Sequence, residues 1–261
     1  MTDIVKNAEQ KIATKKSAII KIEDLRRDFI VGSETVHALR GVTFDIMPGE
    51  FVSIMGTSGS GKSTMLNILG CLDQPTSGKY YIDSIEVSRC TQDELSHIRN
   101  RKIGFVFQSY NLLPRTTSIE QVELPLLYNS SVNAKERKER AEHALELVGM
   151  ENRRNHTPNQ MSGGQQQRIA IARALVNDPV ILLADEATGN LDTRTSYEIM
   201  SLFQKLNESG KTIGFVTHEP DIALFTKRTV MLRDGHVTKD YSVETQSAQA
   251  ALDSLPVSDD Y

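Results

Sequence analysis

Cysteine is scarce in this sequence, with only Cys71 and Cys90 among 261 residues. Two cysteines are too few for a disulfide framework, which indicates a reducing compartment. The chain also lacks any run approaching the roughly 20 apolar residues that span a bilayer. Residues 1–17 are polar and lysine-rich, without the apolar segment of a secretory signal. We therefore expect a chain that is soluble by itself, so that any role at a membrane requires a partner.

An excess of basic residues is missing as well. The chain has 34 acidic residues against 30 lysines and arginines, and its formal net charge is −4. Because nucleic-acid-binding proteins show a basic patch or a high isoelectric point, this balance gives no indication of a nucleic-acid partner. Hydrophobic residues make up 39% of the chain, which is enough for a sizeable core. The length suits one large α/β domain, or a core with a small subdomain.

The clearest motif that is present is a glycine-rich loop with the pattern G-x-x-x-x-G-K-[ST]. Its members are Gly56, Thr57, Ser58, Gly59, Ser60, Gly61, Lys62, Ser63 and Thr64. An apolar run typical of a buried strand (51–55) precedes the loop, and a helical pattern (65–69) follows it. In that context backbone N–H groups and the helix N-terminus bind phosphate, so a chance Gly/Ser-rich turn is the weaker interpretation. Lys62 would supply charge to the β- and γ-phosphates, and the Ser63 hydroxyl would ligate Mg²⁺.

The predicted fold is α/β: a P-loop NTPase core, in which helices flank a mostly parallel sheet, with an N-terminal antiparallel β subdomain and an inserted α-helical subdomain. Strands are expected at 18–22, 35–39, 42–46, 51–55, 79–83, 103–107, 180–184, 212–216 and 228–232, and further helices at 91–101, 134–148, 165–176 and 195–207. We predict a mobile tail over 1–17, a folded domain over 18–240 with its helical subdomain at about 109–160, and a poorly packed tail over 241–261.

Acidic side chains follow the apolar strand 180–184. Open α/β sheets bind ligands outside the carboxyl ends of their strands, so Asp185 and Glu186 should lie beside the phosphate loop. Asp185 suits Mg²⁺, and Glu186 can orient and deprotonate a water molecule. His218 ends the next apolar strand, where its imidazole could hydrogen-bond a γ-phosphate. Taken singly, each has a simpler interpretation as a turn residue or a surface histidine.

A second glycine-bearing turn opens the helix at 165–176. Its residues Ser162, Gly163, Gly164 and Gln165 follow Met161 and make another anion-binding helix start. The chain holds only one acidic strand end, so a second complete site within it is not expected. A two-fold dimer, in which this turn of one copy covers the ATP of the other, uses both helix starts. The simpler alternative is an ordinary glycine-rich helix cap.

In this order the motifs resemble those of the ATP-binding subunit of ABC transporters, and the resemblance covers about 18–240. It implies that Gln108 is the Q-loop glutamine, which touches Mg²⁺ and senses the membrane partner. It further implies that Asp192 is the D-loop aspartate at the dimer seam. Phe29 takes the place of the aromatic residue that stacks on adenine. Two departures are visible, because Met161 stands where Leu is usual and Ala187 stands where Pro usually follows the catalytic Glu.

Several stretches, among them 67–73, 104–108 and 122–126, look like the macrolide-exporter and lipoprotein-releasing branch (MacB-like and LolD-like). That resemblance implies ATP and Mg²⁺ as cofactors, a homodimer, and a separate transmembrane permease at the cytoplasmic face of the inner membrane. A periplasmic or extracellular adaptor could join through the permease. One alternative is an FtsE-like regulatory ATPase that controls cell-envelope enzymes. A soluble ABC ATPase acting on ribosomes or DNA is another, although such proteins usually carry two ATPase halves or a coiled-coil insert.

The stretches 110–114 and 122–128 are unusually apolar for the beginning of a surface subdomain. Two interpretations are open. The residues could pack the helical subdomain, or some of them could line a groove that receives a short cytoplasmic helix of the permease.

Overall fold

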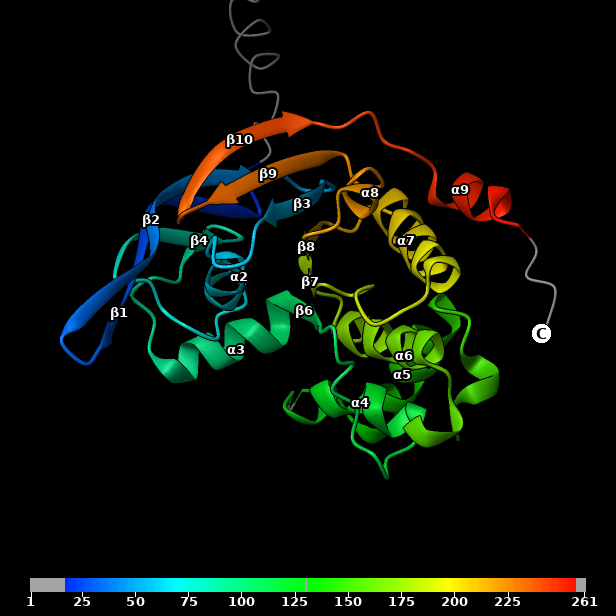
Figure 1. The fold of residues 1–261 in the computed structure, drawn as a ribbon. Helices are drawn as coiled ribbons and strands as arrows, with labels where there is room; N and C mark the ends of the chain where they lie inside the picture. The colour runs from blue at the N-terminus through cyan, green and yellow to red at the C-terminus, as the bar shows by residue number, and fades with distance from the viewer. Residues whose placement is uncertain (1–16, 130, 257–261) are drawn as a thin grey trace, which may run out of the picture.

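The structure, a computed structural model, describes residues 17–129 and 131–256. Two sheets form its framework, a mixed one of six strands and an antiparallel one of four (Figure 1). The six-stranded sheet has the order β10-β9-β3-β8-β7-β6, and the four-stranded sheet has the order β2-β1-β4-β5. The six-stranded sheet comprises β3 (Phe51–Gly56), β6 (Ile103–Val106), β7 (Ile181–Asp185), β8 (Ile213–Thr217), β9 (Arg228–Arg233) and β10 (His236–Ser242).

The core sheet is parallel apart from its edge strand β10, which runs antiparallel to β9. All residues of β8 are buried, and so are the first five of β3. Strands covered on both faces read as continuous apolar runs, which is why these two were visible in the sequence. The predicted fold class is confirmed in both of its sheets.

The antiparallel sheet is made of β1 (Ile20–Val31), β2 (Glu34–Ile46), β4 (Ser77–Ile82) and β5 (Ile85–Glu86). The sequence predicts two strands at 35–39 and 42–46, whereas the chain forms the single long strand β2. Gly41 is the extra residue of a bulge there, since Leu25 pairs with Val42 and Arg26 pairs with Arg40. Its φ of +91° explains why glycine stands at this point.

Helices flank the core sheet and build a separate group at one end of the molecule. They are α2 (Lys62–Leu69), α3 (Gln92–Lys102), α4 (Ser118–Leu127), α5 (Ala134–Leu147), α6 (Gly163–Leu175), α7 (Thr193–Glu208), α8 (Pro220–Ala223) and α9 (Ala248–Ser254), with 3-10 turns at Glu151–Arg153 and Pro158–Gln160. In Figure 1, α4 and α5 lie away from the β1–β2 hairpin, next to α6. The region 109–160 thus holds α4, α5 and both 3-10 turns.

The C-terminal segment corrects the expectation of a poorly packed tail from residue 241. Tyr241 and Ser242 belong to β10, and α9 packs against α7 with Ala248 fully buried. The Gln204 amide fixes the approach, because its Nε2 donates to Gln246 O at 2.7 Å and its Oε1 accepts from Ala248 N at 2.9 Å. The polar composition of this segment does not predict the contact, because both hydrogen bonds come from one glutamine on α7. The remaining tail residues, 1–16 and 257–261, lie outside the described part of the chain.

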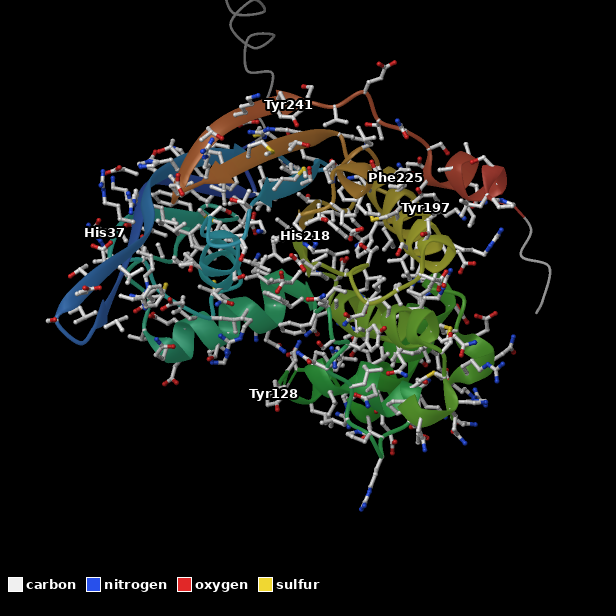
Figure 2. All side chains as sticks on the ribbon, in the orientation of Figure 1. His37, Tyr128, Tyr197, His218, Phe225 and Tyr241 are labelled. Atoms are coloured by element: carbon white, nitrogen blue, oxygen red, sulfur yellow. The ribbon has the colours of Figure 1, made fainter. Side chains whose placement is uncertain are left out.

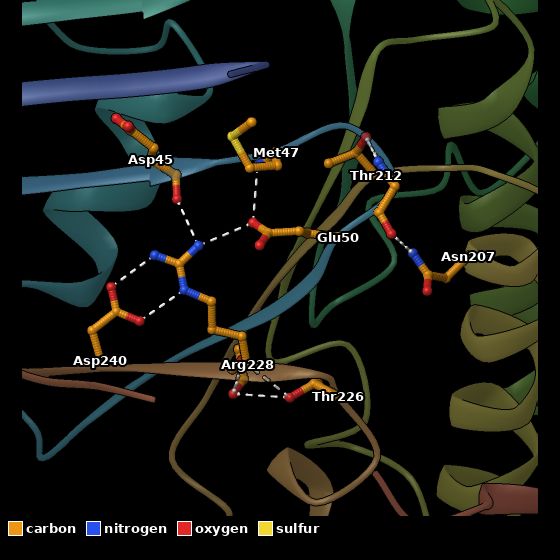
Figure 3. A network of polar contacts seen from close by, with 10 residues as sticks. Asp45, Met47, Glu50, Asn207, Thr212, Thr226, Arg228 and Asp240 are labelled. Carbon is orange, nitrogen blue, oxygen red and sulfur yellow. Dashed lines mark hydrogen bonds and ion pairs between the residues drawn. The ribbon is translucent and has the colours of Figure 1, made fainter. Parts of the chain in front are cut away.

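Arg228, the first residue of β9, ties the two sheets together (Figure 3). Its guanidinium forms two hydrogen bonds of 2.7 Å with Asp240 on β10 and reaches Glu50 at 3.0 Å. A further bond of 2.9 Å goes to the carbonyl of Asp45 on β2. The hydrogen bonds with Asp240 raise the pKa of Arg228 above its usual value. This network holds the antiparallel sheet against the edge of the core sheet.

We expect Arg228→Met to lower the free energy of unfolding by about 1–3 kcal/mol, because charge-assisted hydrogen bonds are lost and solvent already screens part of their contribution. Denaturant unfolding curves measure the change. Arg233→Met, at the other end of β9, is the matched control: its side chain is 77% exposed and pairs only loosely with Asp234, at 3.7 Å. A loss of equal size in both variants would contradict the role given to the network.

Candidate active site

Four neighbouring strands of the core sheet end at one edge, in the order β3, β8, β7, β6. Their last residues are in register: Met55 pairs with Thr217, Asp185 with Val216, and Val106 with Ala184. The residues that follow these strand ends are therefore brought together. They are the phosphate-binding loop at 56–64, His218, the pair Asp185–Glu186, and Gln108.

The loop at 56–64 is shaped by glycine at two tight positions. Gly61 has a φ of +100°, and a Cβ there would lie 2.6 Å from the carbonyl oxygen of Ala38 on β2. A Cβ at Gly56 would lie 2.3 Å from the carbonyl oxygen of Leu232. Lys62 begins α2 and is buried, and its Nζ donates to the carbonyls of Gly56 at 2.8 Å and Thr57 at 3.1 Å. An ammonium group is thus held inside the loop, where the motif predicts a phosphate.

Glu186 and His218 form a pair that the sequence did not predict. The Nδ1 atom of His218 lies 2.8 Å from Oε1 of Glu186. The backbone of Glu186 is in the left-handed region, with a φ of +43°. Figure 2 shows His218 near the middle of the molecule, between α2 and α7. When Nδ1 donates to the carboxylate, Nε2 can donate to a phosphate only if the ring is protonated. The imidazole is therefore placed to fix the orientation of Glu186.

Oxygen atoms suitable for a magnesium ion lie at the same edge. Burial raises the pKa of Asp185, the charge of Glu186 raises it further, and Lys62 lowers it. Among residues 17–129 and 131–256, no group of three or more His, Cys, Asp and Glu side chains could hold a metal. One carboxylate with the hydroxyl of Ser63 and the amide oxygen of Gln108 fits Mg²⁺, which takes one or two carboxylates and completes its shell with water and phosphate.

Gln108 stands in the loop that follows β6 and contacts the turn after β7. Its Nε2 lies 3.4 Å from Oδ1 of Asn190, and Nδ2 of Asn190 donates to the carbonyl of Gln108 at 3.1 Å. The same loop is held from α6, because the guanidinium of Arg173 bonds to the carbonyls of Tyr110 and Asn111. Burial lowers the pKa of Arg173. The sequence predicts no role for the side chain of Asn190 or of Arg173.

Gln167 is another supporting residue, and its role is not predicted from the sequence. It is fully buried on α6, and its Nε2 donates to the carbonyl of Ala187 at 2.8 Å. Ala187 follows the predicted catalytic Glu186, at the position where the resemblance leads one to expect proline. A hydrogen bond from Gln167 therefore restrains the backbone that proline would otherwise stiffen. A glutamine on the buried face of a helix was the available signal, since buried amides need partners.

The turn Ser162–Gln165 lies elsewhere in the chain. Ser162 caps α6 by accepting from Gln165 N at 3.3 Å, and the Gln165 side chain accepts from Ser162 N at 3.1 Å. A Cβ at Gly163 would meet the hydroxyl of Tyr110 at 2.8 Å, and one at Gly164 would meet Thr195 at 2.4 Å. Within one chain this turn packs against α7 and against the loop after β6 that holds Gln108 and Tyr110, which we call the Q-loop. The phosphate-binding loop packs against β2 instead.

Two other predicted residues have structural partners of their own. Asp192 caps α7, accepting hydrogen bonds from N and Oγ1 of Thr195 at 2.9 and 2.6 Å, and these bonds lower its pKa. Phe29 lies on β1 near the tip of the hairpin, opposite Val36 and 37% exposed. The guanidinium of Arg27 lies 4.5 Å from the centre of its ring. The dimer role of Asp192 and the adenine role of Phe29 stay predictions.

The described helices include none that is long and apolar enough to cross a membrane. The ABC transporter family matches residues 39–189. An uncharacterised ABC transporter ATP-binding protein of Thermotoga maritima is 57% identical over 84% of this chain and 93% of its own length. The macrolide export ATP-binding/permease protein MacB of Syntrophobacter fumaroxidans is 50% identical over 83% of this chain, which spans 31% of that protein.

A solved structure has the same fold. It is a dimeric post-hydrolysis state of the ATP-binding cassette MJ0796, bound to ADP and Pi, a protein of Methanocaldococcus jannaschii. That structure is 49% identical, covers 87% of this chain and all of its own, and superposes with a TM-score of 0.78. The resemblance inferred from the motifs is confirmed. The chain belongs to the ABC transporter family and is one of its ATP-binding cassettes, an ABC-type ATPase.

Proposed function

We propose that this chain binds Mg·ATP and hydrolyses it as a homodimer, energising a separate membrane permease. The observation that carries the proposal is the Glu186–His218 pair, 2.8 Å apart, at the sheet edge that also holds Asp185 and the phosphate-binding loop. In the dimer, Ser162–Gln165 of one copy would cover the ATP held by 56–64 of the other. The dimeric state of the related cassette with ADP and Pi supports this arrangement.

Each residue of the edge has a part in this reaction. Lys62 and the N–H groups of the loop bind the phosphate oxygens. Ser63, Asp185 and Gln108 would hold Mg²⁺, which when bound neutralises charge on the transferred phosphoryl group. Glu186 accepts the proton of the attacking water, and its hydrogen bond with His218 through Oε1 leaves Oε2 free for that water. Asp192 and Phe29 would contact the partner copy and the adenine, respectively.

The permease contact is assigned to a groove beside the Q-loop. This groove has a volume of about 780 Å³, and its apolar lining includes Phe105, Phe107, Leu113, Leu124 and Tyr128. Leu113 is 50% exposed and Tyr128 80% exposed, and Figure 2 shows Tyr128 at the periphery. Apolar side chains left open in this way suit the apolar face of a short helix. Asn111 also lines the groove, and Gln108 precedes it by three residues in the same loop. Gln108 would therefore connect the groove to the nucleotide.

We expect Leu113→Asp to abolish or strongly weaken capture of the permease, because a charge would be buried in the apolar contact. Co-purification with the tagged transmembrane protein measures this. Leu72→Asp is the matched control, since Leu72 is 47% exposed and does not line the groove. The isolated Leu113→Asp chain should keep its melting temperature and ATP binding. Unfolding of that variant would mean that Leu113 belongs to the core of the helical subdomain.

The branch to which the chain belongs determines whether ATP hydrolysis drives transport or regulates another enzyme. MacB relatives, named as macrolide export ATP-binding/permease proteins, support an export complex. Lipoprotein extraction, a place at the cytoplasmic face of the inner membrane and an adaptor reached through the permease belong to the same proposal. The FtsE-like alternative predicts regulation of envelope enzymes without transport. Substrate movement by the reconstituted complex supports the first proposal, whereas ATP-dependent activation of an envelope enzyme without any transport supports the second.

A further inference from the structure

The amide of Gln108 rests on two residues of the turn after Glu186, Gly189 and Asn190, which we call the amide seat. Asn190 exchanges two hydrogen bonds with Gln108, one to its side chain at 3.4 Å and one to its carbonyl at 3.1 Å. A Cβ added at Gly189 would lie only 2.8 Å from Nε2 of Gln108. Any side chain at 189 would therefore push the Gln108 amide away from the turn.

The chemistry of these contacts fixes which end of the Gln108 amide faces Asn190. A backbone carbonyl can only accept, so the atom of Asn190 that points to Gln108 O must be the amino group. The oxygen of Asn190 then faces Gln108 and requires a donor, which is Nε2. Oε1 of Gln108 is left as the free end, and it accepts no hydrogen bond from the described residues. An oxygen is the atom that a magnesium ion would use.

The seat belongs to the same turn as the catalytic carboxylate and the dimer seam. The N–H of Gly189 donates to the carbonyl of Glu186 at 2.9 Å, which closes the turn. Two residues beyond Asn190, Asp192 caps α7. A shift of Gln108 by an occupant of the neighbouring groove would therefore reach the turn that carries both Glu186 and Asp192. Among the described residues, Gln108 makes no other hydrogen bond with this turn.

We propose that Gly189 and Asn190 are positioning residues that turn Oε1 of Gln108 toward the metal. The inference rests on the proposed function, in which Gln108 is a magnesium ligand. Partners that orient a metal ligand typically change metal affinity about 10–100-fold when removed, because an unrestrained ligand must be ordered on binding. Asn190 donates no atom to the nucleotide or the metal in this proposal, and acts only through Gln108.

The experiment measures binding of Mn²⁺, as a paramagnetic probe, to the full chain with a non-hydrolysable ATP analogue. We expect Asn190→Ala to raise the dissociation constant for Mn²⁺ about tenfold or more. Affinity for the nucleotide without metal should not change. Gly189→Ala should act in the same direction, because the added Cβ displaces Nε2. Asn67→Ala, an exposed asparagine on α2, is the matched control and should have no effect.

A Gln108→Ala background separates the possible failures. There, Asn190→Ala should cause no further loss, because the residue it positions is gone. If Gln108→Ala weakens Mn²⁺ binding and Asn190→Ala does not, the amide seat is wrong and the metal role of Gln108 stands. If Gln108→Ala itself has no effect, the metal assignment falls and this inference falls with it. A lowered melting temperature in Asn190→Ala but not in Gly189→Ala, without a change in Mn²⁺ affinity, would reduce Asn190 to a structural residue.

Discussion

Replacing Glu186 by Gln should slow ATP hydrolysis by about 10²–10⁴-fold, the usual contribution of a general base. The glutamine keeps the size of the side chain and can still accept the hydrogen bond from His218 Nδ1, but it cannot take a proton from water. ATP binding should be retained, because the substitution leaves the phosphate-binding loop unchanged and lowers the pKa of the neighbouring Asp185. The charge of Glu186 raises the pKa of Asp185, so its removal favours the ionised carboxylate that would hold Mg²⁺.

Two measurements examine this expectation together. Phosphate release gives the rate of ATP hydrolysis. Sedimentation velocity with Mg·ATP should show a stable dimer that dissociates when the nucleotide is removed. Glu219→Gln is the matched control, because it removes a carboxylate next to His218 that the mechanism does not use. Near-normal hydrolysis by Glu186→Gln, with only monomer in the centrifuge, would show that another group serves as base.

Strand ends were the part of the site that the sequence predicted well. Asp185 and His218 each follow a continuous apolar run, and parallel strands place their carboxyl ends at one edge. The strand register then brings them close together, since Asp185 pairs with Val216, two residues before His218. The phosphate-binding loop carries its own backbone requirements, most clearly the positive φ of Gly61. Local signals of this kind need no knowledge of distant contacts.

Contacts between segments far apart in the chain were not predictable in this way. Gln167 reaches Ala187 across 20 residues, and Asn190 reaches Gln108 across 82. An amide on a helix or in a turn has many possible partners, and only the packed structure selects one. The same holds for α9, whose position on α7 combines the buried Ala248 with hydrogen bonds to Gln204 and Ser201. The sequence therefore predicted which residues follow the strand ends, and it did not predict the contacts that Gln167 and Asn190 make with distant segments.

The second large effect is expected for Lys62→Ala, which should raise the dissociation constant for ATP about 10–100-fold. Hydrogen bonds to charged groups contribute roughly 1.5–3 kcal/mol each, and every 1.4 kcal/mol is a factor of ten. The Lys62 ammonium is buried and already rests on the carbonyls of Gly56 and Thr57. It therefore meets the phosphates without first being drawn out of water, which makes its loss costly for binding.

Calorimetric titration with ATP measures the loss, and Lys79→Ala, an exposed lysine on β4, is the control for removing one positive charge. Long-range attraction of the nucleotide would fall equally in both variants, whereas only Lys62 lies within the loop. Thermal denaturation separates binding from folding: without nucleotide Lys62→Ala should melt cooperatively, and added ATP should raise its melting temperature less than it raises that of the unaltered chain. Unchanged affinity in the folded variant would remove Lys62 from the phosphate site, and with it the simplest reading of the loop at 56–64.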